Sequence, residues 1–396
     1  MVDHRLLPPE LWFEIFEWAT VNSTLCAAEW TPFEAIPDNA RDPSIHTRAT
    51  ISRVCSIWRR WVTPLLFKDI KIRNGAHALQ LVLEKHAGSE AVGRRYGDMV
   101  RRVVLPYPST VPELGKATQS IEILKLCTHM HTLLRPQHSM LDGLRFDREV
   151  TGVVLPSLQR LEWCFNGEAD RSGGINSLCC MLRNAPQISF LFIGGVVGNH
   201  YMCMDPWPIE LSRLDTLRLN IRSGSLLRQI MLRWSMPSLT RLIIDSPPVK
   251  EGLDSLWETF GSRLEVVELG KHMRFLMNND LPPCVEGCPN LKELHYYLFF
   301  TNPPDHVPYH AHLTTVRLHA AVNGLLVEGS ALWGLIRRHW DFLCSDNLEA
   351  LQRIVLHGNW RPILTHPSFQ DIQQEIKAKG RTIELASQQY DLKYRI

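Results

Sequence analysis

The chain has 396 residues, more than one hydrophobic core usually supports, so we expect two domains or an elongated array of repeats. Apolar residues make up 45% of the sequence and charged residues 21%, which is typical of a folded chain and excludes a disordered one. The formal net charge is only +2, so the composition does not indicate a surface for nucleic acids or anionic membranes.

The first residues and the cysteines indicate the cellular compartment. Asp3, two prolines and Glu10 stand where the apolar segment of a secretory signal peptide would lie. The longest strongly apolar stretch, Ile188 to Gly198, is too short to cross a bilayer. We therefore expect no membrane segment, and we expect the ten scattered cysteines to be reduced, in a cytoplasmic or nuclear protein.

The segment from Leu7 to Ala19 predicts a short helix that begins at a pair of prolines. Proline is tolerated at the start of a helix, because the N–H groups there have no partner within the helix. Glu10 falls in the first turn, where its charge complements the helix dipole. Leu11, Ile15 and Trp18 recur at helical spacing and form one apolar stripe, which needs a surface to pack against.

A second helix is predicted from about Thr47 to Trp61. Its apolar residues recur at helical spacing: Ile51, Val54, Cys55, Trp58 and Val62. We expect Thr63-Pro64 to end this helix, and residues 65–70 to form a turn or the start of a strand. Residues 21–46 are rich in Pro, Asp, Asn and Ser, so we expect a loop inserted between the two helices.

These segments resemble the F-box family, a small three-helix module that docks on the Skp-type adaptor of cullin–RING ubiquitin ligases. The matching residues, in the order of the family pattern, are Leu7, Pro8, Glu10, Leu11, Ile15, Phe16, Val54, Cys55, Trp58, Arg59, Leu66 and Phe67. The family usually has a short connection between its first two helices, and the longer one here fits the F-box-like variant common in mushroom-forming fungi. The resemblance implies that six residues lie on or directly under the adaptor-binding face: Leu7, Pro8, Leu11, Ile15, Val54 and Trp58.

From Val100 onward a pattern recurs in which three apolar residues are separated by two residues and then by one. Its copies begin at Val100, Leu158, Ile188, Leu214, Leu239, Leu264, Leu291, Leu313 and Leu351, with a weaker copy at Met130. From Leu158 to Leu313 successive copies start 22 to 30 residues apart, close to the length of a leucine-rich repeat. Four copies also have a proline two residues before their start, where it ends a preceding helix.

Helical stretches alternate with these strand signals. Four are predicted: Ile175–Arg183, Leu226–Trp234, Leu253–Phe260 and Leu325–Phe342. Near the end, Phe369, Ile372 and Ile376 form one more helical stripe. Gly380 ends that helix, and a strand from Thr382 to Ala386 closes the array. Strand followed by helix at this length is the unit of a horseshoe solenoid, and this part of the chain resembles the irregular leucine-rich repeats attached to many F-box proteins.

The expected fold therefore belongs to the α/β class. It combines an N-terminal helical F-box-like module over residues 1–74, with its inserted loop at about 21–46, and an irregular leucine-rich-repeat solenoid over residues 75–396. A TIM barrel would also alternate strands and helices. Its period is usually longer, and its strands lack the preceding proline, so it is the weaker alternative.

The sequence contains no recognisable catalytic motif. It has neither a glycine-rich phosphate loop nor a Gly-x-Ser-x-Gly nucleophile elbow. Cys284 and Cys288 have no second pair at zinc-binding spacing and are interpreted as core thiols. His306, His310 and His312 are interpreted as residues of a solvated loop. We therefore expect no enzyme activity, no metal and no cofactor.

In a solenoid of this kind, the strand residues that do not face the core line a surface for a partner. Eight such residues are candidates for contact with a target: Arg218, Asn220, Arg241, Asp245, Glu268, His295, Arg317 and His319. The sequence thus favours a substrate adaptor, with the Skp-type adaptor and its cullin scaffold at one end and an unknown protein target at the other. The alternatives are a repeat scaffold without ligase association and, more remotely, a barrel hydrolase.

Overall fold

The computed structural model describes residues 7–20, 30–36, 44–72, 76–85, 95–105, 122–135, 154–165, 174–195, 208–221, 224–246, 253–273, 280–321 and 330–386. The chain divides into two compact units. Unit 1 comprises Met1–Trp30, Ala35–Leu214 and Trp234–Pro237, and unit 2 comprises Thr31–Glu34, Asp215–Arg233 and Ser238–Ile396. The expected domain boundary at residues 74 and 75 stays a prediction; the last helix of the N-terminal module runs directly into the first strand.

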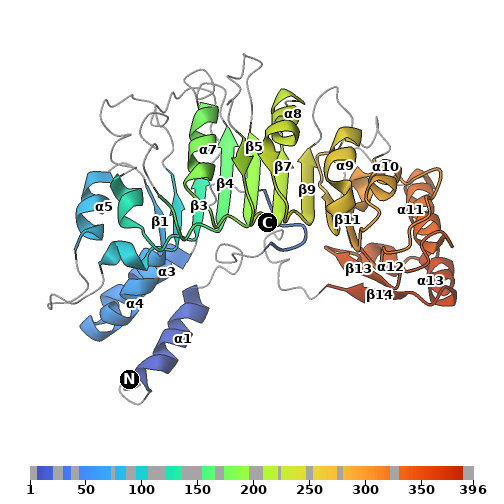
Figure 1. Cartoon of the computed structure of the whole chain (residues 1–396). Coiled ribbons are helices and arrows are strands. Elements are labelled where there is room, and N and C mark those ends of the chain that lie inside the picture. Colours follow the sequence, from blue (N-terminus) through green and yellow to red (C-terminus); the bar gives the residue numbers. More distant parts are fainter. Residues whose placement is uncertain are drawn as a thin grey trace. The chain divides into compact units, whose positions relative to one another are not determined.

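Among the described residues of unit 1, three helices form the N-terminal module: α1 (Pro9–Thr20), α3 (Ser44–Val54) and α4 (Ser56–Lys68). Each packs on the other two (Figure 1). Phe16 on α1 is buried with Val62 and Leu65 of α4, and the Trp58 ring lies 5.0 Å from the Phe16 ring. The helix predicted from Leu7 to Ala19 is therefore confirmed as α1.

The second predicted helix is interrupted at Cys55 and continues further than expected. Cys55 has an extended backbone (φ −158°, ψ 170°), and its Sγ accepts a hydrogen bond from the Trp58 N–H at 3.4 Å, so it caps α4. The predicted end at Thr63-Pro64 is wrong, because α4 runs through Pro64 to Lys68. Burial of Val62 and Leu65 on the two sides of the proline offsets the hydrogen bond that proline cannot make.

The described residues of unit 1 include five strands, each paired in parallel with the next: β1 (Asp69–Lys71), β2 (Arg102–Val104), β3 (Thr132–Arg135), β4 (Arg160–Phe165) and β5 (Phe190–Gly195). Around them lie α5 (Ala76–Leu83), the 3-10 helix η2 (Tyr96–Met99), α7 (Gly174–Arg183), and the short parallel pair β6 (Ile209–Glu210) and β8 (Trp234–Ser235). The weaker repeat copy at Met130 thus does form a strand, β3.

Unit 2 has seven strands among its described residues, again parallel and each paired with the next: β7 (Thr216–Asn220), β9 (Arg241–Ser246), β10 (Val266–Leu269), β11 (Glu293–Tyr297), β12 (Thr315–His319), β13 (Arg353–His357) and β14 (Thr382–Leu385). Its helices are α8 (Gly224–Arg233), α9 (Asp254–Phe260), η3 (Gly261–Arg263), α10 (Leu281–Gly287), η4 (Leu298–Phe300), α11 (Ser330–Cys344), α12 (Arg361–Leu364) and α13 (Phe369–Ala378).

The strand register confirms the repeat pattern read from the sequence. The central apolar residues of successive copies in unit 2 pair laterally and are all buried: Leu217, Leu242, Val267, Leu294, Val316 and Ile354. The part of the chain that the structure describes is an α/β protein with a 12-stranded, all-parallel sheet. Among the described strands, β1 and β14 each have one neighbour, so these strands do not close as a TIM barrel would.

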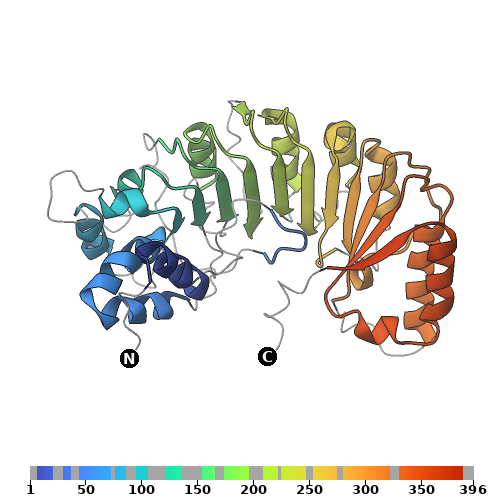
Figure 2. The ribbon, with the colours of Figure 1, turned by 90° about the horizontal axis from the view of Figure 1, so that it is seen from below.

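The helices of unit 2 cover one face of its strands, as the yellow to red part of Figure 2 shows. There the ring centroid of Trp340 on α11 lies 5.6 Å from that of Phe369 on α13, and the ring centroid of Tyr296 on β11 lies 5.4 Å from that of His339 on α11. Gly380 follows α13 with a φ of 71°, which confirms the predicted stop. Within the part of the chain that the structure describes, no helix combines the length and the apolarity that a membrane crossing requires.

Candidate functional site

The helical module of unit 1 exposes large apolar side chains. On α1 and just before it, Leu7 is 37% exposed, Leu11 43% and Ile15 45%. Trp18, one turn further on, is 86% exposed, because the opposite side of α1 carries Phe16 into the core. The helix is therefore apolar on both sides, and only one side is covered by described residues.

The six residues predicted to contact the Skp-type adaptor differ in their exposure to solvent. Leu7, Pro8, Leu11, Ile15 and Val54 are exposed. Trp58 is half-buried, with its ring 4.9 Å from that of Trp12. Trp58 therefore supports α1 from beneath, whereas the other five present apolar surface.

The eight residues predicted to contact a target lie on β7, β9, β10, β11 and β12, but they are less open than expected. Arg218, Asp245, Glu268 and His295 are buried, and Asn220, Arg241, Arg317 and His319 are half-buried. Charged side chains are rarely buried unless they are paired. Two observations account for the burial: ion pairs that run across the strands, and a distant segment of the chain that lies over them.

Ion pairs join neighbouring strands on this face. Arg218 of β7 donates to both carboxylate oxygens of Asp245 on β9, with Nε–Oδ2 at 2.7 Å and Nη2–Oδ1 at 2.9 Å. Burial alone would lower the pKa of Arg218, but the Asp245 charge and hydrogen bonds, with Glu268 and Glu34 nearby, raise it above its ordinary value. The guanidinium therefore stays charged inside the protein.

A second set of contacts is centred on His295 of β11. Its Nδ1 lies 3.4 Å from Glu268 Oε2, and its Nε2 lies 3.1 Å from Glu293 Oε2. The Nε of Arg317 on β12 donates to the same Glu293 oxygen at 2.9 Å. The hydrogen bond from His295, followed by that from Arg317, lowers the pKa of Glu293 to about 2.

The segment that lies over these strands is Thr31–Glu34, which belongs to unit 2 despite its early position in the chain. The Phe33 N–H donates to Glu268 Oε2 at 3.0 Å, and Arg218 Nη2 donates to the Glu34 carbonyl oxygen at 2.8 Å. Figure 2 shows this blue segment on the strand face opposite the helices of unit 2. Two buried charged residues of the sheet thus bind backbone groups of the segment.

The Phe33 side chain enters an aromatic cage. Its ring centroid lies 5.1 Å from those of Tyr297 and His319, 5.0 Å from that of His357 and 5.9 Å from that of His295. The contacts with Tyr297, His319 and His357 are edge-to-face, which the quadrupoles of the rings favour. We call these four wall residues the aromatic cage.

The strand register builds the cage. Tyr297, His319 and His357 are lateral neighbours at the last positions of β11, β12 and β13, and His295 is two residues before Tyr297 on the same face. Burial, followed by the charges of Arg317, His319 and His295, lowers the pKa of His357 to about 4. The wall formed by His357 is therefore uncharged at neutral pH.

The residues that flank this segment are held separately, within unit 1. Trp30 and Ile36 pack against Cys164, Phe190 and Phe192 on β4 and β5. These three side chains project from the strands and not from the helices, so here too the strand face carries an apolar cluster.

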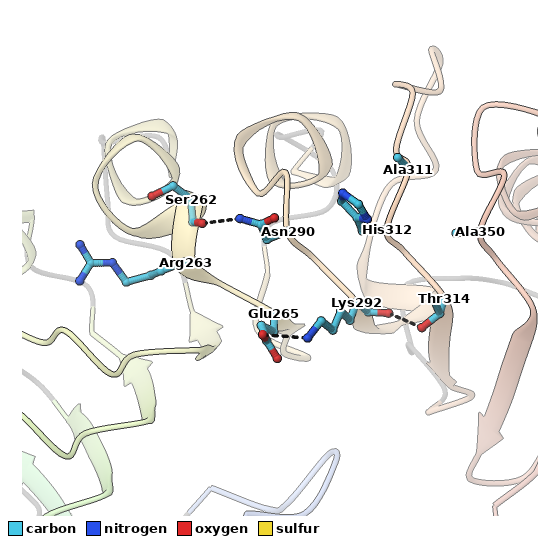
Figure 3. A pocket seen from close by; sticks show the side chains of 9 residues that line it. All are labelled: Ser262, Arg263, Glu265, Asn290, Lys292, Ala311, His312, Thr314 and Ala350. Carbon is cyan, nitrogen blue, oxygen red and sulfur yellow. Dashed lines mark hydrogen bonds and ion pairs between the residues drawn. The ribbon is translucent and has the colours of Figure 1, made fainter.

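A hollow of about 550 Å³ lies at the start of the strands of unit 2 (Figure 3). Its lining is Ser262, Arg263, Glu265, Asn290, Lys292, Ala311, His312, Thr314 and Ala350. The carboxylate in this lining, Glu265, forms an exposed ion pair with Lys292 at 2.8 Å. The hollow is thus lined by polar side chains and two alanines, with no large apolar side chain among them to anchor a ligand.

The candidate metal ligands have structural roles. Cys284 and Cys288 are buried, as expected for core thiols. His310 is buried and not solvated as predicted: its Nδ1 accepts from the His312 and Leu313 N–H groups, and its Nε2 donates to the Cys288 carbonyl oxygen at 2.9 Å. Within the described ranges, no three His, Cys, Asp or Glu residues converge as metal ligands would.

Sequence reasoning missed three parts of the site: Phe33, Tyr297 and His357. The two wall residues carry a detectable signal, because successive strands end in Tyr, His and His one position after the third apolar anchor. Phe33 carries none. No protein-family model matches the chain, and a search of the curated proteins found no significant match. The function is therefore inferred from the contacts of the molecule itself.

Proposed function

We propose that this chain is a substrate-recognition adaptor of a cullin–RING ubiquitin ligase of the SCF type. The N-terminal helical module would bind the Skp-type adaptor, and through it the cullin scaffold. The parallel sheet would act as an irregular leucine-rich-repeat solenoid that holds a target protein. The observation that carries the proposal is the exposure of Leu11, Ile15 and Trp18 on a helix whose other side is already packed.

Single exposed apolar residues are ordinary, but a stripe of them on one short helix is not. Leu11, Ile15 and Trp18 are spaced four and three residues apart, so they lie together on α1. Large aromatic and aliphatic side chains arranged in this way are the usual anchors of a protein interface. Leu11 and Ile15 also match the F-box pattern, and Trp18 follows the first part of that pattern on the same helix.

The proposed role requires no chemistry from this chain. Other subunits would transfer ubiquitin, and this chain would raise the local concentration of the target near them, an effect of tethering. Binding surfaces with paired charges and aromatic anchors support such a role on the strand face of unit 2. A cytoplasmic or nuclear location belongs to the same proposal.

The test is a pull-down of the purified full chain with a purified Skp-type adaptor. We expect the wild type to bind and the double variant Leu11→Asp/Ile15→Asp to lose at least about tenfold in affinity, since two exposed apolar anchors that the adaptor would cover would become charged. The matched control is Leu81→Asp/Leu232→Asp, which places the same number of new carboxylates at exposed leucines of α5 and α8. The control should bind like the wild type.

Two results would contradict the proposal. If the wild type is folded by circular dichroism and does not bind, the helices only cap the sheet and the chain is a scaffold without ligase association. If both double variants lose binding equally, the loss follows from added charge and not from the α1 stripe.

A further inference from the structure

The aromatic cage of unit 2 is filled by a residue from a remote part of the chain. Phe33 and its hydrogen-bond partner Glu268 are 235 residues apart in the sequence. The described segment 30–36 forms neither helix nor strand, so it adds no ladder of backbone bonds to the sheet. Holding such a segment in place costs conformational entropy, which the cage contacts must offset.

A turn of the segment and the cage together hold Phe33: the Glu34 N–H donates to the Thr31 carbonyl oxygen at 3.2 Å, which places Phe33 at the third position of a β-turn. The φ of Phe33 is 59°, in the left-handed region that non-glycine residues rarely adopt. A residue persists in that region only where its surroundings over-determine its position. Here four rings surround the side chain and Glu268 fixes the N–H.

The cage walls lie on the strand face opposite the core row, although His295 among them is buried between Glu268 and Glu293 and the Nδ1 of His319 accepts from the Ala321 N–H. The core row of these strands is Leu294, Val316 and Ile354, all buried under the helices. Tyr297 and His319 project from the other face and are half-buried even with Phe33 in place. His357 also keeps its Nε2 buried without a hydrogen-bond partner among the described residues. Walls of this kind suit a ligand better than they suit a core.

From these contacts we propose that the aromatic cage is a binding site for an extended peptide segment that presents an aromatic side chain, and that Phe33 occupies it as an internal competitor. The site recognises one aromatic ring, the N–H of the same residue through Glu268, and the carbonyl group of the following residue through Arg218. The assignment of this ligand as the target rests on the proposed function. The site itself stands on contacts within unit 2 and would serve a scaffold equally.

The probe is a fluorescein-labelled peptide of residues 30–36, Trp-Thr-Pro-Phe-Glu-Ala-Ile, added to full-length protein and followed by fluorescence anisotropy. The chain with Phe33→Ala should bind this peptide at least about tenfold more tightly than the wild type, in which the internal segment competes. A peptide with alanine in place of its phenylalanine should bind neither protein. Adding His319→Ala to Phe33→Ala should abolish the gain.

The outcome that overturns the proposal is a Phe33→Ala chain with the circular dichroism spectrum of the wild type that binds the peptide no more tightly. Thr31–Glu34 would then be a structural clasp only. If the Phe33→Ala chain does not fold, hydrogen exchange of the wild-type chain tests the proposal instead. Peptide supplied above roughly 1 mM, the effective concentration of a tethered segment, should speed hydrogen exchange of the peptic fragment that holds residues 31–36, and the alanine peptide should not. An unchanged exchange rate overturns the proposal.

Peptide binding and adaptor binding can fail separately. The Leu11→Asp/Ile15→Asp chain that also carries Phe33→Ala should bind the peptide as tightly as Phe33→Ala alone. Phe33→Ala should bind the Skp-type adaptor like the wild type. Loss of peptide binding in the first case would mean that the cage depends on α1, which contradicts the assignment of the site to unit 2.

Discussion

The buried ion pair between Arg218 and Asp245 allows a direct test of how the strand face is stabilised. The two side chains are 2% and 6% exposed and form two hydrogen bonds. Asp245→Ala would leave the guanidinium inside the protein without its carboxylate. Removing one partner of such a pair usually costs about 3–5 kcal/mol, because the remaining charge stays desolvated. Arg218 keeps its bond to the Glu34 carbonyl oxygen, so we expect the lower end, about 3 kcal/mol.

A second ion pair of the same unit gives the control. Lys292 and Glu265 lie 2.8 Å apart, almost the same distance, but their side chains are 58% and 43% exposed. Water solvates each partner when the other is removed, so Glu265→Ala should cost less than about 1 kcal/mol. The two pairs therefore differ in burial and hardly in length. The pairs also differ in the cation and in the number of hydrogen bonds, so a difference in cost measures burial together with the bidentate geometry of Arg218.

Hydrogen exchange on the amides of β7, β9 and β10 is the suitable assay, because a chain with two units need not unfold in one step. Asp245→Ala should accelerate exchange there by about two orders of magnitude, and Glu265→Ala by less than about tenfold. Replacing the pair by Arg218→Met/Asp245→Leu should restore most of the protection. The reasoning is refuted if Asp245→Ala and Glu265→Ala have the same effect.

Three further predictions concern single positions in unit 2. Gly358→Ala should lower the free energy of unfolding in urea by about 1–3 kcal/mol, because φ at this position is +83° and a Cβ would lie 3.0 Å from the His319 ring. The control Gly334→Ala, at a position of α11 with open space around it, should raise it by up to about 1 kcal/mol. Equal effects of the two variants would contradict this reasoning. Burial lowers the pKa of His339 to about 3, so the unfolded chain binds more protons below about pH 6.5 and stability falls as the pH drops from there toward 3. His339→Gln should reduce this slope, measured as urea midpoints at two pH values, and an unchanged slope would show that other groups cause it. Tyr296→Phe should raise stability by about 1 kcal/mol, since the buried hydroxyl has no hydrogen-bond partner among the described residues; a clear loss would indicate that a partner exists.

The sheet could be predicted from the sequence because its apolar period is local. Leu217, Leu242 and Val267 were identified as central anchors, and they pair laterally in the structure. The side-chain alternation of a strand then separates the core row from the row on the open face. This is why all eight predicted target residues do lie on strands of unit 2, although their burial was not foreseen.

The unpredicted features depend on packing between residues far apart in the chain. Pro64 is a helix breaker by local rules, yet the core formed by Phe16 and Leu65 carries α4 past it. The contact of Phe33 with Glu268 spans 235 residues and follows no period, so composition indicated only a loop. His310 looked solvated beside its prolines, but the Cys288 carbonyl group accepts its hydrogen bond in the interior.

The in-register ends of β11, β12 and β13 have a consequence for how such a surface can change. Each strand supplies its last residue as a wall of the cage, and β11 supplies His295 as well, all from positions that the core row does not use, so folding and recognition depend largely on different residues of the same strand. Substitutions at Tyr297, His319 or His357 could therefore produce a new specificity one wall at a time while Leu294 and its neighbours preserve the fold. An insertion of one residue within a strand would do the opposite, turning a core side chain outward and a wall inward. A sheet of this kind therefore tolerates substitution of its surface residues, but not an insertion or deletion that moves side chains to the other face of a strand.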